Sequence, residues 1–276
     1  MNIEKYSDWL VASDVDGTIL NKHRKLVKKN IDAVADFVKE GGNFTLASGR
    51  NPQSLWRYYR KLPLKLPAIV INGAGIYDFA KQEMIYFSPM SESAMEQACK
   101  IAKSHPTLDA VVVTKDALYV TGIGVWGVYY VIVDRLTHKR KFNIEKVPKE
   151  DWGKVIFCGA PWRVEKLRKK LEGEDTSDFV FYSGSNVSVE IIGEQANKGT
   201  AIRKLAEILG IDNEHIAGIG DYYNDTDMLE KVAVPACAGQ APRTIKEISE
   251  FVACHCNKGA VADFLNYIVK TKIEKK

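Results

Sequence analysis

Short apolar runs alternate with amphipathic helical segments at both ends of the 276-residue chain, and this alternation restricts the fold more than any other feature. Residues 9–13, 43–47 and 68–71 are apolar runs with the length of a buried strand. The segments 28–40 and 52–60 between them have the composition and periodicity of helices. Strands separated by helices need crossover connections, and such connections produce a parallel sheet.

The same alternation returns near the C-terminus. A helix over 198–209 is predicted by one apolar face and by Gly210, a residue type that commonly ends helices. The elements predicted after it are strands over 216–219, 232–237 and 251–255 and helices over 225–231, 242–250 and 259–269. We therefore expect the two ends of the chain to form one α/β domain.

In the middle of the chain, β-rich runs are separated by brief polar turns, which is typical of antiparallel hairpins. The paired runs are 76–79 with 84–87, 110–114 with 118–121, and 179–183 with 187–192, and a helix is predicted over 91–104. This pattern predicts an α+β module inserted into the α/β domain. We place the module at 83–187 and the discontinuous α/β domain at 1–82 and 188–276.

Composition and charge exclude several classes of protein. The net charge of +4 is too small to indicate a nucleic-acid-binding surface. The longest apolar run, 128–133, is far shorter than the roughly 20 residues of a membrane-spanning helix, and the first residues lack the pattern of a signal peptide. The five cysteines are odd in number, as is typical of reduced thiols. We expect a cytoplasmic protein without nucleic-acid or membrane partners, and the sequence does not indicate its oligomeric state.

Two carboxylates follow the first predicted strand, in the run Asp14-Val15-Asp16-Gly17-Thr18. Ligands of open α/β sheets bind at the carboxyl ends of the strands. Carboxylates two residues apart can divide a reaction between an attacking group and a proton carrier. A polar turn capped by Asp14 is the alternative. The position after a buried strand favours Asp14 and Asp16 as catalytic residues.

Two further runs, Ser48-Gly49-Arg50 and Asn197-Lys198-Gly199, stand at predicted helix starts. The Ser48 hydroxyl and the N–H groups around Gly49 can bind an anion, and they are equally typical of a helix N-cap. Lys198 is placed unfavourably against the helix dipole, which a nearby anion would explain. A solvated lysine is the alternative.

Hard oxygen ligands follow another predicted strand, in the run Gly220-Asp221-Tyr222-Tyr223-Asn224-Asp225. Mg2+ prefers hard oxygen ligands, and the carboxylates of Asp221 and Asp225 and the amide of Asn224 supply oxygens of this kind. A helix N-cap and a calcium loop are alternatives, although the spacing does not match an EF-hand.

Together the four runs resemble the motifs of the haloacid dehalogenase superfamily of phosphohydrolases, and within it the Cof-like, type IIB group. SDVDGT is similar to the first motif, ASGR to the second, NKG to the third and GDYYND to the fourth. The resemblance extends over about residues 9–265, and Asn72-Gly73-Ala74 is similar to a run that this subgroup often has before its cap domain. It implies a Rossmann-like parallel-sheet core domain with an inserted α+β cap of type C2B.

The resemblance also implies an activity, namely Mg2+-dependent hydrolysis of a small phosphorylated metabolite such as a sugar phosphate. Asp14 would attack the phosphoryl group to form an aspartyl-phosphate, and Asp16 would protonate the leaving group and then activate water. Lys198 would support catalysis. The implied metal ligands are Asp14, the Asp16 carbonyl and Asp221, with Asn224 or Asp225 in support. The implied phosphate-binding residues are Ser48, Gly49, Lys198 and Asn224.

Two other functions are compatible with these residues. A phosphotransferase similar to phosphomannomutase would use the same Asp14 nucleophile and transfer the phosphoryl group to a second hydroxyl. A non-catalytic metabolite-binding protein would keep the fold but lose at least one motif acid, and all of them are present.

Three other signals are weaker. The run from Gly122 to Gly127 matches the dinucleotide motif GxGxxG, but it lies in the hairpin-rich module, so we expect a glycine-rich loop there. Residues 137–141 are basic and predict a solvated loop, and the alternative is that their charge attracts anionic substrates into the cleft. Cys254, His255 and Cys256 have no second Cys/His cluster to complete a metal site, so we expect them to be packing residues.

Overall fold

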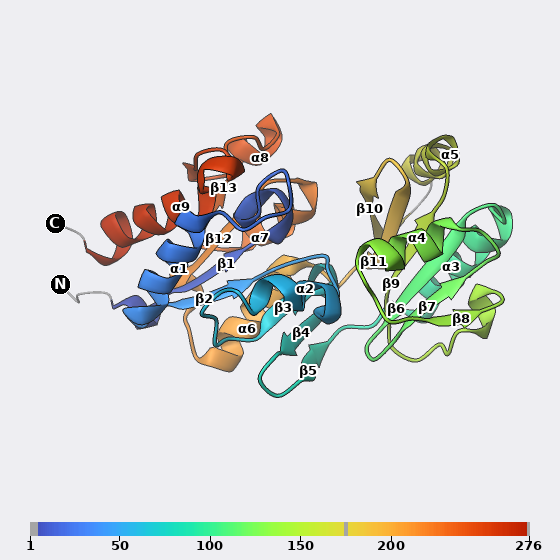
Figure 1. The fold of residues 1–276 in the computed structure, drawn as a ribbon, viewed down its shortest axis with the longest axis horizontal. Coiled ribbons are helices and arrows are strands. Elements are labelled where there is room, and N and C mark those ends of the chain that lie inside the picture. Colours follow the sequence, from blue (N-terminus) through green and yellow to red (C-terminus); the bar gives the residue numbers. More distant parts are fainter. Residues whose placement is uncertain (1–4, 174–175, 275–276) are drawn as a thin grey trace. The chain divides into compact units, whose positions relative to one another are not determined.

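The computed structural model describes residues 5–173 and 176–274, and its ribbon is drawn in Figure 1. The chain divides into two compact units. The discontinuous unit consists of Met1–Ile85 and Asn197–Lys276, and the inserted unit consists of Tyr86–Ala196. The second boundary therefore differs from the one expected at 187. A cut there would separate two strands of one hairpin, which the structure keeps together in the inserted unit.

The discontinuous unit is built on a five-stranded parallel sheet with the strand order β14-β13-β12-β1-β2. The strands are β1 (Leu10–Ser13), β2 (Asn43–Leu46), β12 (Ile216–Gly220), β13 (Val234–Cys237) and β14 (Phe251–Val252). This confirms the predicted α/β class. From β1 the chain proceeds toward β2 on one side, whereas β12, β13 and β14 extend on the other side. The carboxyl ends of β1 and β12 therefore form the switch point at which open α/β sheets bind ligands.

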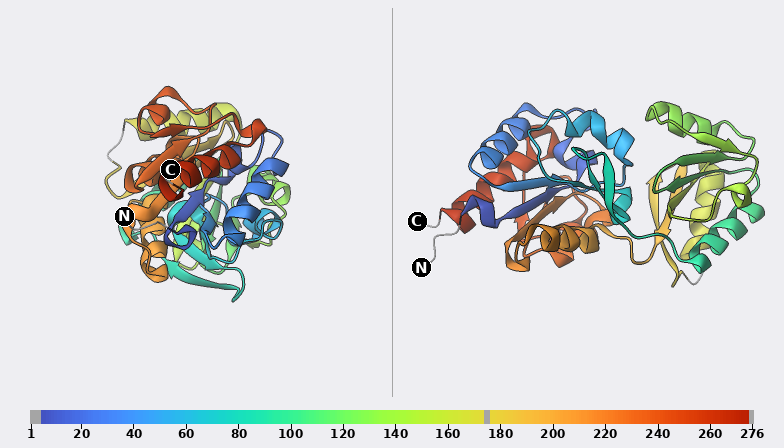
Figure 2. Two further views of the ribbon diagram at one scale, coloured as in Figure 1. Left: turned by 90° about the vertical axis from the view of Figure 1, so that its left-hand side faces the viewer. Right: turned by 90° about the horizontal axis from the view of Figure 1, so that it is seen from below.

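Helices cover both faces of this sheet, as Figures 1 and 2 show. Helix α1 (Lys28–Lys39) packs against α9 (Ala260–Ile268) on one face, and α6 (Lys198–Leu209) packs against α7 (Thr226–Lys231) on the other. The remaining helices of the unit are α2 (Pro52–Tyr59) and α8 (Arg243–Glu247). All four β1 residues are buried because helices lie on both sides of them. This explains why the parallel strands appear in the sequence as continuous apolar runs.

A small antiparallel sheet follows β2. It has the order β3-β4-β5 and consists of β3 (Ala68–Val70), β4 (Gly75–Asp78) and β5 (Glu83–Phe87). The predicted hairpin over 76–87 is thereby confirmed. Ala47 forms a parallel bridge with Ile69, which connects the end of β2 to this sheet.

The inserted unit contains a six-stranded sheet with the order β10-β11-β9-β6-β7-β8. Its strands are β6 (Asp109–Thr114), β7 (Leu118–Thr121), β8 (Lys139–Lys141), β9 (Trp152–Cys158), β10 (Phe179–Ser185) and β11 (Ser188–Gly193). Its helices are α3 (Glu92–Ser104), α4 (Trp126–Val133) and α5 (Pro161–Glu172). Helices α3 and α5 bury their apolar residues with one face of the sheet. The two hairpins and α3 were predicted, whereas β9, α4 and α5 were not.

The basic segment 137–141 also differs from expectation. It was predicted as a loop, and its residues Lys139–Lys141 are all exposed, but they form strand β8 and pair in parallel with β7. The predicted strand at 251–255 is also shorter, because β14 ends at Val252. All five cysteines are free, and no helix among the described residues has the length and apolarity needed to cross a membrane.

The glycine-rich loop between β7 and α4 encloses the buried carboxylate of Asp109. The N–H groups of Gly124 and Gly127 donate hydrogen bonds to it at 2.8 and 2.9 Å. A Cβ atom on Gly122 or Gly124 would collide with this carboxylate, and Gly122 has a φ of +94°. The GxGxxG spacing is thus explained by close approach of the loop to Asp109.

Replacing Asp109 with alanine is expected to lower the free energy of unfolding by about 1–3 kcal/mol, because two N–H groups of the loop lose a charged acceptor. Urea denaturation of the variant measures this change. The control is Asp116→Ala, which removes an exposed aspartate from the same unit and is expected to change stability by less than about 0.5 kcal/mol. Equal effects of the two substitutions would contradict this account of the loop.

Candidate active site

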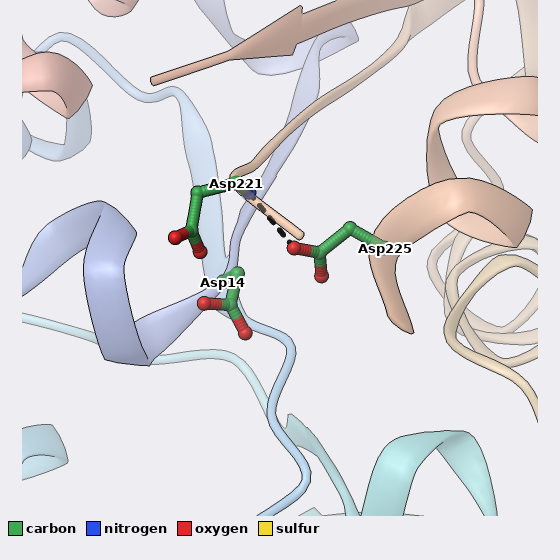
Figure 3. A group of neighbouring side chains, drawn as sticks. All are labelled: Asp14, Asp221 and Asp225. Carbon is green, nitrogen blue, oxygen red and sulfur yellow. Dashed lines mark hydrogen bonds between the residues drawn. The ribbon is translucent and has the colours of Figure 1, made fainter. Parts of the chain in front are cut away.

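Three carboxylates from distant parts of the sequence converge at the carboxyl ends of β1 and β12. The Asp14 N–H donates to the carbonyl of Ile219 at 2.9 Å, which fixes the end of β1 beside the end of β12. One oxygen from each of Asp14, Asp221 and Asp225 lies within 4.8 Å of the others, and Figure 3 shows the three side chains as neighbours. The sequence placed these residues after predicted strands, and the parallel sheet brings them together.

The turn after Asp14 holds Asp221 in place. Gly17 has a φ of +86°, and a Cβ atom at this position would collide with the Asp221 carboxylate. The Thr18 hydroxyl donates to Asp221 Oδ1 at 3.2 Å, and the Gln240 amide donates to the carbonyl of Gly17. Glycine is therefore required here both for its backbone conformation and for the space that it leaves to Asp221.

Lys198 is buried between two of the carboxylates. Its Nζ lies 2.6 Å from Asp14 Oδ1 and 2.6 Å from Asp225 Oδ1, and the residue is 1% exposed. Burial disfavours the ammonium, but the carboxylates of Asp14 and Asp225 outweigh that penalty and raise the pKa of Lys198. These two carboxylates are anions close to the lysine that begins α6, so the alternative of a solvated lysine was wrong.

Asp225 organises the neighbouring loop. Its Oδ1 accepts from Lys198, and its Oδ2 accepts the N–H groups of Asp221 at 2.9 Å and Tyr222 at 3.2 Å. The side chain is completely buried at the end of a short 3-10 turn, Tyr223–Asp225, which also contains the half-buried Asn224. Asp225 thus fixes both Lys198 and the backbone of Asp221.

The mutual proximity of these groups changes their acidities. Burial, followed by repulsion from Asp225 and Asp221, raises the pKa of Asp14 well above its usual value, although Lys198 opposes the shift. Burial and repulsion from Asp225 raise the pKa of Asp221 to about 6. The carboxylates of Asp14, Asp221 and Asp225 can therefore carry more negative charge than the ammonium of Lys198 neutralises.

This donor set fits a divalent cation. It consists of carboxylate oxygens, which Mg2+ prefers, and two of its acids have raised pKa values that a bound cation would lower again. The two Asp225 oxygens accept three hydrogen bonds of 2.6 to 3.2 Å. The Asp221 oxygens accept longer contacts from Thr18 and Gln240, at 3.2 and 3.5 Å, and Asp14 contacts Lys198 through Oδ1. Asp14 and Asp221 are therefore better placed to bind a metal directly.

Added Mg2+ is expected to raise the melting temperature at about pH 8 and to have a much smaller effect at about pH 5. At the lower pH, Asp221 is mostly protonated because its pKa is about 6, and a protonated carboxyl is a poor ligand. In the metal-free protein, the raised pKa of Asp221 adds to the free energy of unfolding at pH values below the ordinary carboxyl pKa. This added stability is lost as the pH rises through about 6. Scanning calorimetry with and without Mg2+ measures both effects.

The variant Asp221→Asn is expected to lose the pH-dependent shift, whereas Asp36→Asn, at an exposed position on α1, is expected to keep it. A Mg2+-induced shift that is the same at both pH values would contradict a site that contains Asp221.

The segment after β2 comes close to the start of α6. Ser48 is buried, and its hydroxyl accepts the N–H of Arg50 at 3.2 Å, which leaves the hydroxyl hydrogen for donation. A Cβ atom on Gly49 would collide with the side-chain oxygen of Asn72, and one on Gly73 would collide with the backbone at Asn197. Two glycines therefore allow three chain segments to meet next to Lys198.

Asp16 is held by Arg50. The guanidinium donates from Nε to Asp16 Oδ2 at 2.7 Å and from Nη2 to Asp16 Oδ1 at 2.8 Å. The Arg50 side chain is 8% exposed, whereas that of Asp16 is 45% exposed. The sequence predicted a role for Asp16 but none for Arg50.

Sequence reasoning also missed Thr18, Gln240 and the packing of Asn72. Thr18 lies in the run that begins at Asp14, and Arg50 lies in the run that begins at Ser48. The Thr18 hydroxyl and the Arg50 guanidinium could therefore have been predicted as partners of the site carboxylates. Gln240 lies 19 residues after Asp221 in a loop without a recognisable pattern, and only the folded structure brings it to Asp221.

Comparison with known proteins identifies the family of the chain. The family model of haloacid dehalogenase-like hydrolases matches residues 11–265. The pyridoxal phosphate phosphatase YbhA of Escherichia coli is 22% identical, and the alignment covers 93% of this chain and 97% of that protein. The HMP-PP phosphatase of Citrobacter koseri is 24% identical, with 94% of each chain covered.

Solved structures share the fold over most of the chain. TM0651 from Thermotoga maritima matches with a TM-score of 0.80 at 22% identity, covering 95% of this chain and 98% of that one. The subclass IIB sugar phosphatase BT4131 matches with a TM-score of 0.76 at 15% identity, covering 94% and 98%. Because the family model spans nearly the entire chain, which confirms the resemblance seen in its four motifs, the protein belongs to the haloacid dehalogenase-like hydrolases.

Proposed function

We propose that this protein is a Mg2+-dependent phosphatase that hydrolyses a small phosphorylated metabolite through an aspartyl-phosphate on Asp14. The observation that carries the proposal is the contact between the buried carboxylate of Asp14 and Lys198 at the switch point of the sheet, beside Asp221. This arrangement places a nucleophile next to the cation that a phosphate needs.

Asp14 and Lys198 act in the first step. An Asp14 oxygen attacks phosphorus, and the bond from phosphorus to the leaving oxygen breaks. A carboxylate 4 Å from a phosphate oxygen meets a repulsion of about 4 kcal/mol per charge pair at an effective dielectric constant near 20. Lys198 offsets part of this repulsion. Mg2+, held by Asp14, Asp221 and the Asp16 carbonyl, would supply further charge stabilisation when bound.

Asp16 moves the protons. It donates a proton to the departing alkoxide, then takes one from the water molecule that attacks the phosphorus of the aspartyl-phosphate. The bond between phosphorus and the Asp14 oxygen breaks, and inorganic phosphate leaves. Asp16 is back in its starting protonation state, so the cycle is balanced.

The remaining site residues bind the phosphate. The buried Ser48 hydroxyl and the N–H of Gly49 donate to its oxygens, and Lys198 and Asn224 complete the binding site in this proposal. We assign Asp225 the task of holding Lys198 and the Asp221 loop, on the basis of its hydrogen bonds.

The names of the relatives support a class of substrate. Their names specify pyridoxal phosphate, HMP-PP and sugar phosphates, which are all small phosphorylated compounds. We propose a metabolite of this size, with sugar phosphates as the first candidates, and we assign the inserted unit the role of the cap domain. We also propose a cytoplasmic location, where the five free cysteines would stay reduced.

The test is a screen for inorganic phosphate release with Mg2+, across sugar phosphates, nucleotides, phosphoglycolate, pyridoxal phosphate and flavin mononucleotide. We expect metal-dependent release of phosphate together with the dephosphorylated compound. Transfer of the phosphoryl group to a second sugar hydroxyl would instead identify a phosphotransferase. Absence of turnover across the panel would contradict the proposal.

A further inference from the structure

We propose that Arg50 is a positioning residue that holds Asp16 in the orientation needed to protonate the leaving group. This inference rests on the proposed function, and the two can fail separately. It starts from a difference among the proposed catalytic residues. Asp14 and Lys198 are buried and contact each other at 2.6 Å, and Lys198 also contacts Asp225, whereas the Asp16 side chain is 45% exposed.

Asp16 needs an external support because of its place in the chain. It lies in a turn with non-helical backbone angles and precedes Gly17, whose φ is +86°. An exposed aspartate in such a turn has several accessible rotamers. Among the residues that the structure describes, Arg50 supplies every side-chain hydrogen bond found on the Asp16 carboxylate, at 2.7 and 2.8 Å.

The contact fixes orientation as well as distance. A guanidinium that donates from Nε and Nη2 to both oxygens of a carboxylate sets the plane of that carboxylate. Each oxygen keeps a second lone pair that faces away from the guanidinium. Those lone pairs are where Asp16 can exchange a proton with a leaving oxygen or with water. A lysine at position 50 would provide charge but not this planar contact.

Arg50 is itself firmly held. Its Nη1 donates to Ser54 Oγ at 3.3 Å, and its guanidinium carbon lies 5.2 Å from the centre of the Tyr58 ring. Its carbonyl accepts the N–H of Ile71 at 2.9 Å. The same residue that follows Ser48 and Gly49 therefore connects the proposed phosphate-binding segment to the proton carrier.

The experiment compares leaving groups. The value of kcat/KM covers steps up to transfer of the phosphoryl group to Asp14, so it reports the acid role of Asp16 without its later role as base. An alkyl phosphate needs a proton on its leaving oxygen, whereas p-nitrophenyl phosphate releases a stable anion. For Arg50→Met and Arg50→Lys we expect kcat/KM to fall by about 10²-fold or more with glycerol 3-phosphate and by less than about 10-fold with p-nitrophenyl phosphate.

Three controls define the outcome. Asp16→Asn is expected to reproduce the same selective loss, and the double variant with Arg50→Met is expected to show no further loss. Arg57→Met removes another arginine that lies over Tyr58, at 5.0 Å, and is expected to leave both kcat/KM values unchanged.

Equal losses on both substrates in the Arg50 variants would overturn the positioning role and indicate a structural or phosphate-binding role instead. Absence of wild-type turnover on these two substrates and across the whole phosphate-release panel would contradict the proposed function itself.

Discussion

Replacement of Asp14 by asparagine is expected to lower kcat by at least ~10³-fold, because the amide cannot act as the attacking oxygen nucleophile. The substitution keeps the size of the side chain. It also removes a buried negative charge whose repulsion by Asp225 and Asp221 contributes to a raised pKa. The folded state should therefore persist while turnover is lost. Phosphate release measured under saturating substrate, together with the melting temperature, separates these effects.

The matched control is Asp32→Asn, which changes an aspartate whose side chain is 55% exposed on α1. It is expected to retain the full kcat. Residual activity of Asp14→Asn above about a tenth of the wild-type value, with a folded protein, would exclude Asp14 as the nucleophile.

Replacement of Lys198 by methionine is expected to lower the free energy of unfolding by about 3–5 kcal/mol, because the buried carboxylates of Asp14 and Asp225 lose the cation that they share. The Nζ atom lies 2.6 Å from an oxygen of each carboxylate, and the side chain is fully buried. Urea denaturation in the absence of Mg2+ measures the loss. Activity is expected to fall as well, since the phosphate loses its cation.

Lys204→Met is the control for this change, because Lys204 is a partly exposed lysine on the same helix. It is expected to change stability by less than about 0.5 kcal/mol. Combining Lys198→Met with Asp225→Asn removes one of the two buried carboxylates that lost their cation. The double variant is therefore expected to regain part of the lost stability. A Lys198→Met protein as stable as the wild type would contradict the buried ion-pair arrangement.

The sequence predicted the discontinuous unit well because local pattern and burial agree there. Strand β1 is buried on both faces, and its neighbours are separated by helices with one apolar face, so the pattern corresponds directly to the fold. The inserted unit was predicted less completely. Strand β9 contains Lys154, a charged residue that is buried and contacts Glu190 at 2.7 Å. Because this charge interrupts the apolar run, the sequence pattern did not indicate a buried strand.

Helix α4 was missed for a different reason. Its sequence is apolar all round, so it has no amphipathic period, and only Gly127 and Val131 are buried. The boundary of the inserted unit at 187 was misplaced because β10 and β11 were recognised as a pair by pattern and then assigned to different domains.

The acids and the lysine of the site were identifiable because strand ends of a parallel sheet meet at one edge, and each stands directly after a strand or at a helix start. Their mutual contacts were not identifiable. The Arg50–Asp16 pair joins residues 34 positions apart, and nothing in a linear pattern distinguishes it from two solvated charges.

The central claim is that Asp14 carries the phosphoryl group, and the most direct measurement is to trap it. Wild-type protein mixed with a 32P-labelled substrate and Mg2+ is quenched in acid within the first turnover. Labelled peptides are then identified by mass spectrometry. We expect an acid-stable, hydroxylamine-sensitive label on the peptide that contains Asp14, and no label in Asp14→Asn. Label on another residue, or label that persists in Asp14→Asn, would contradict the mechanism.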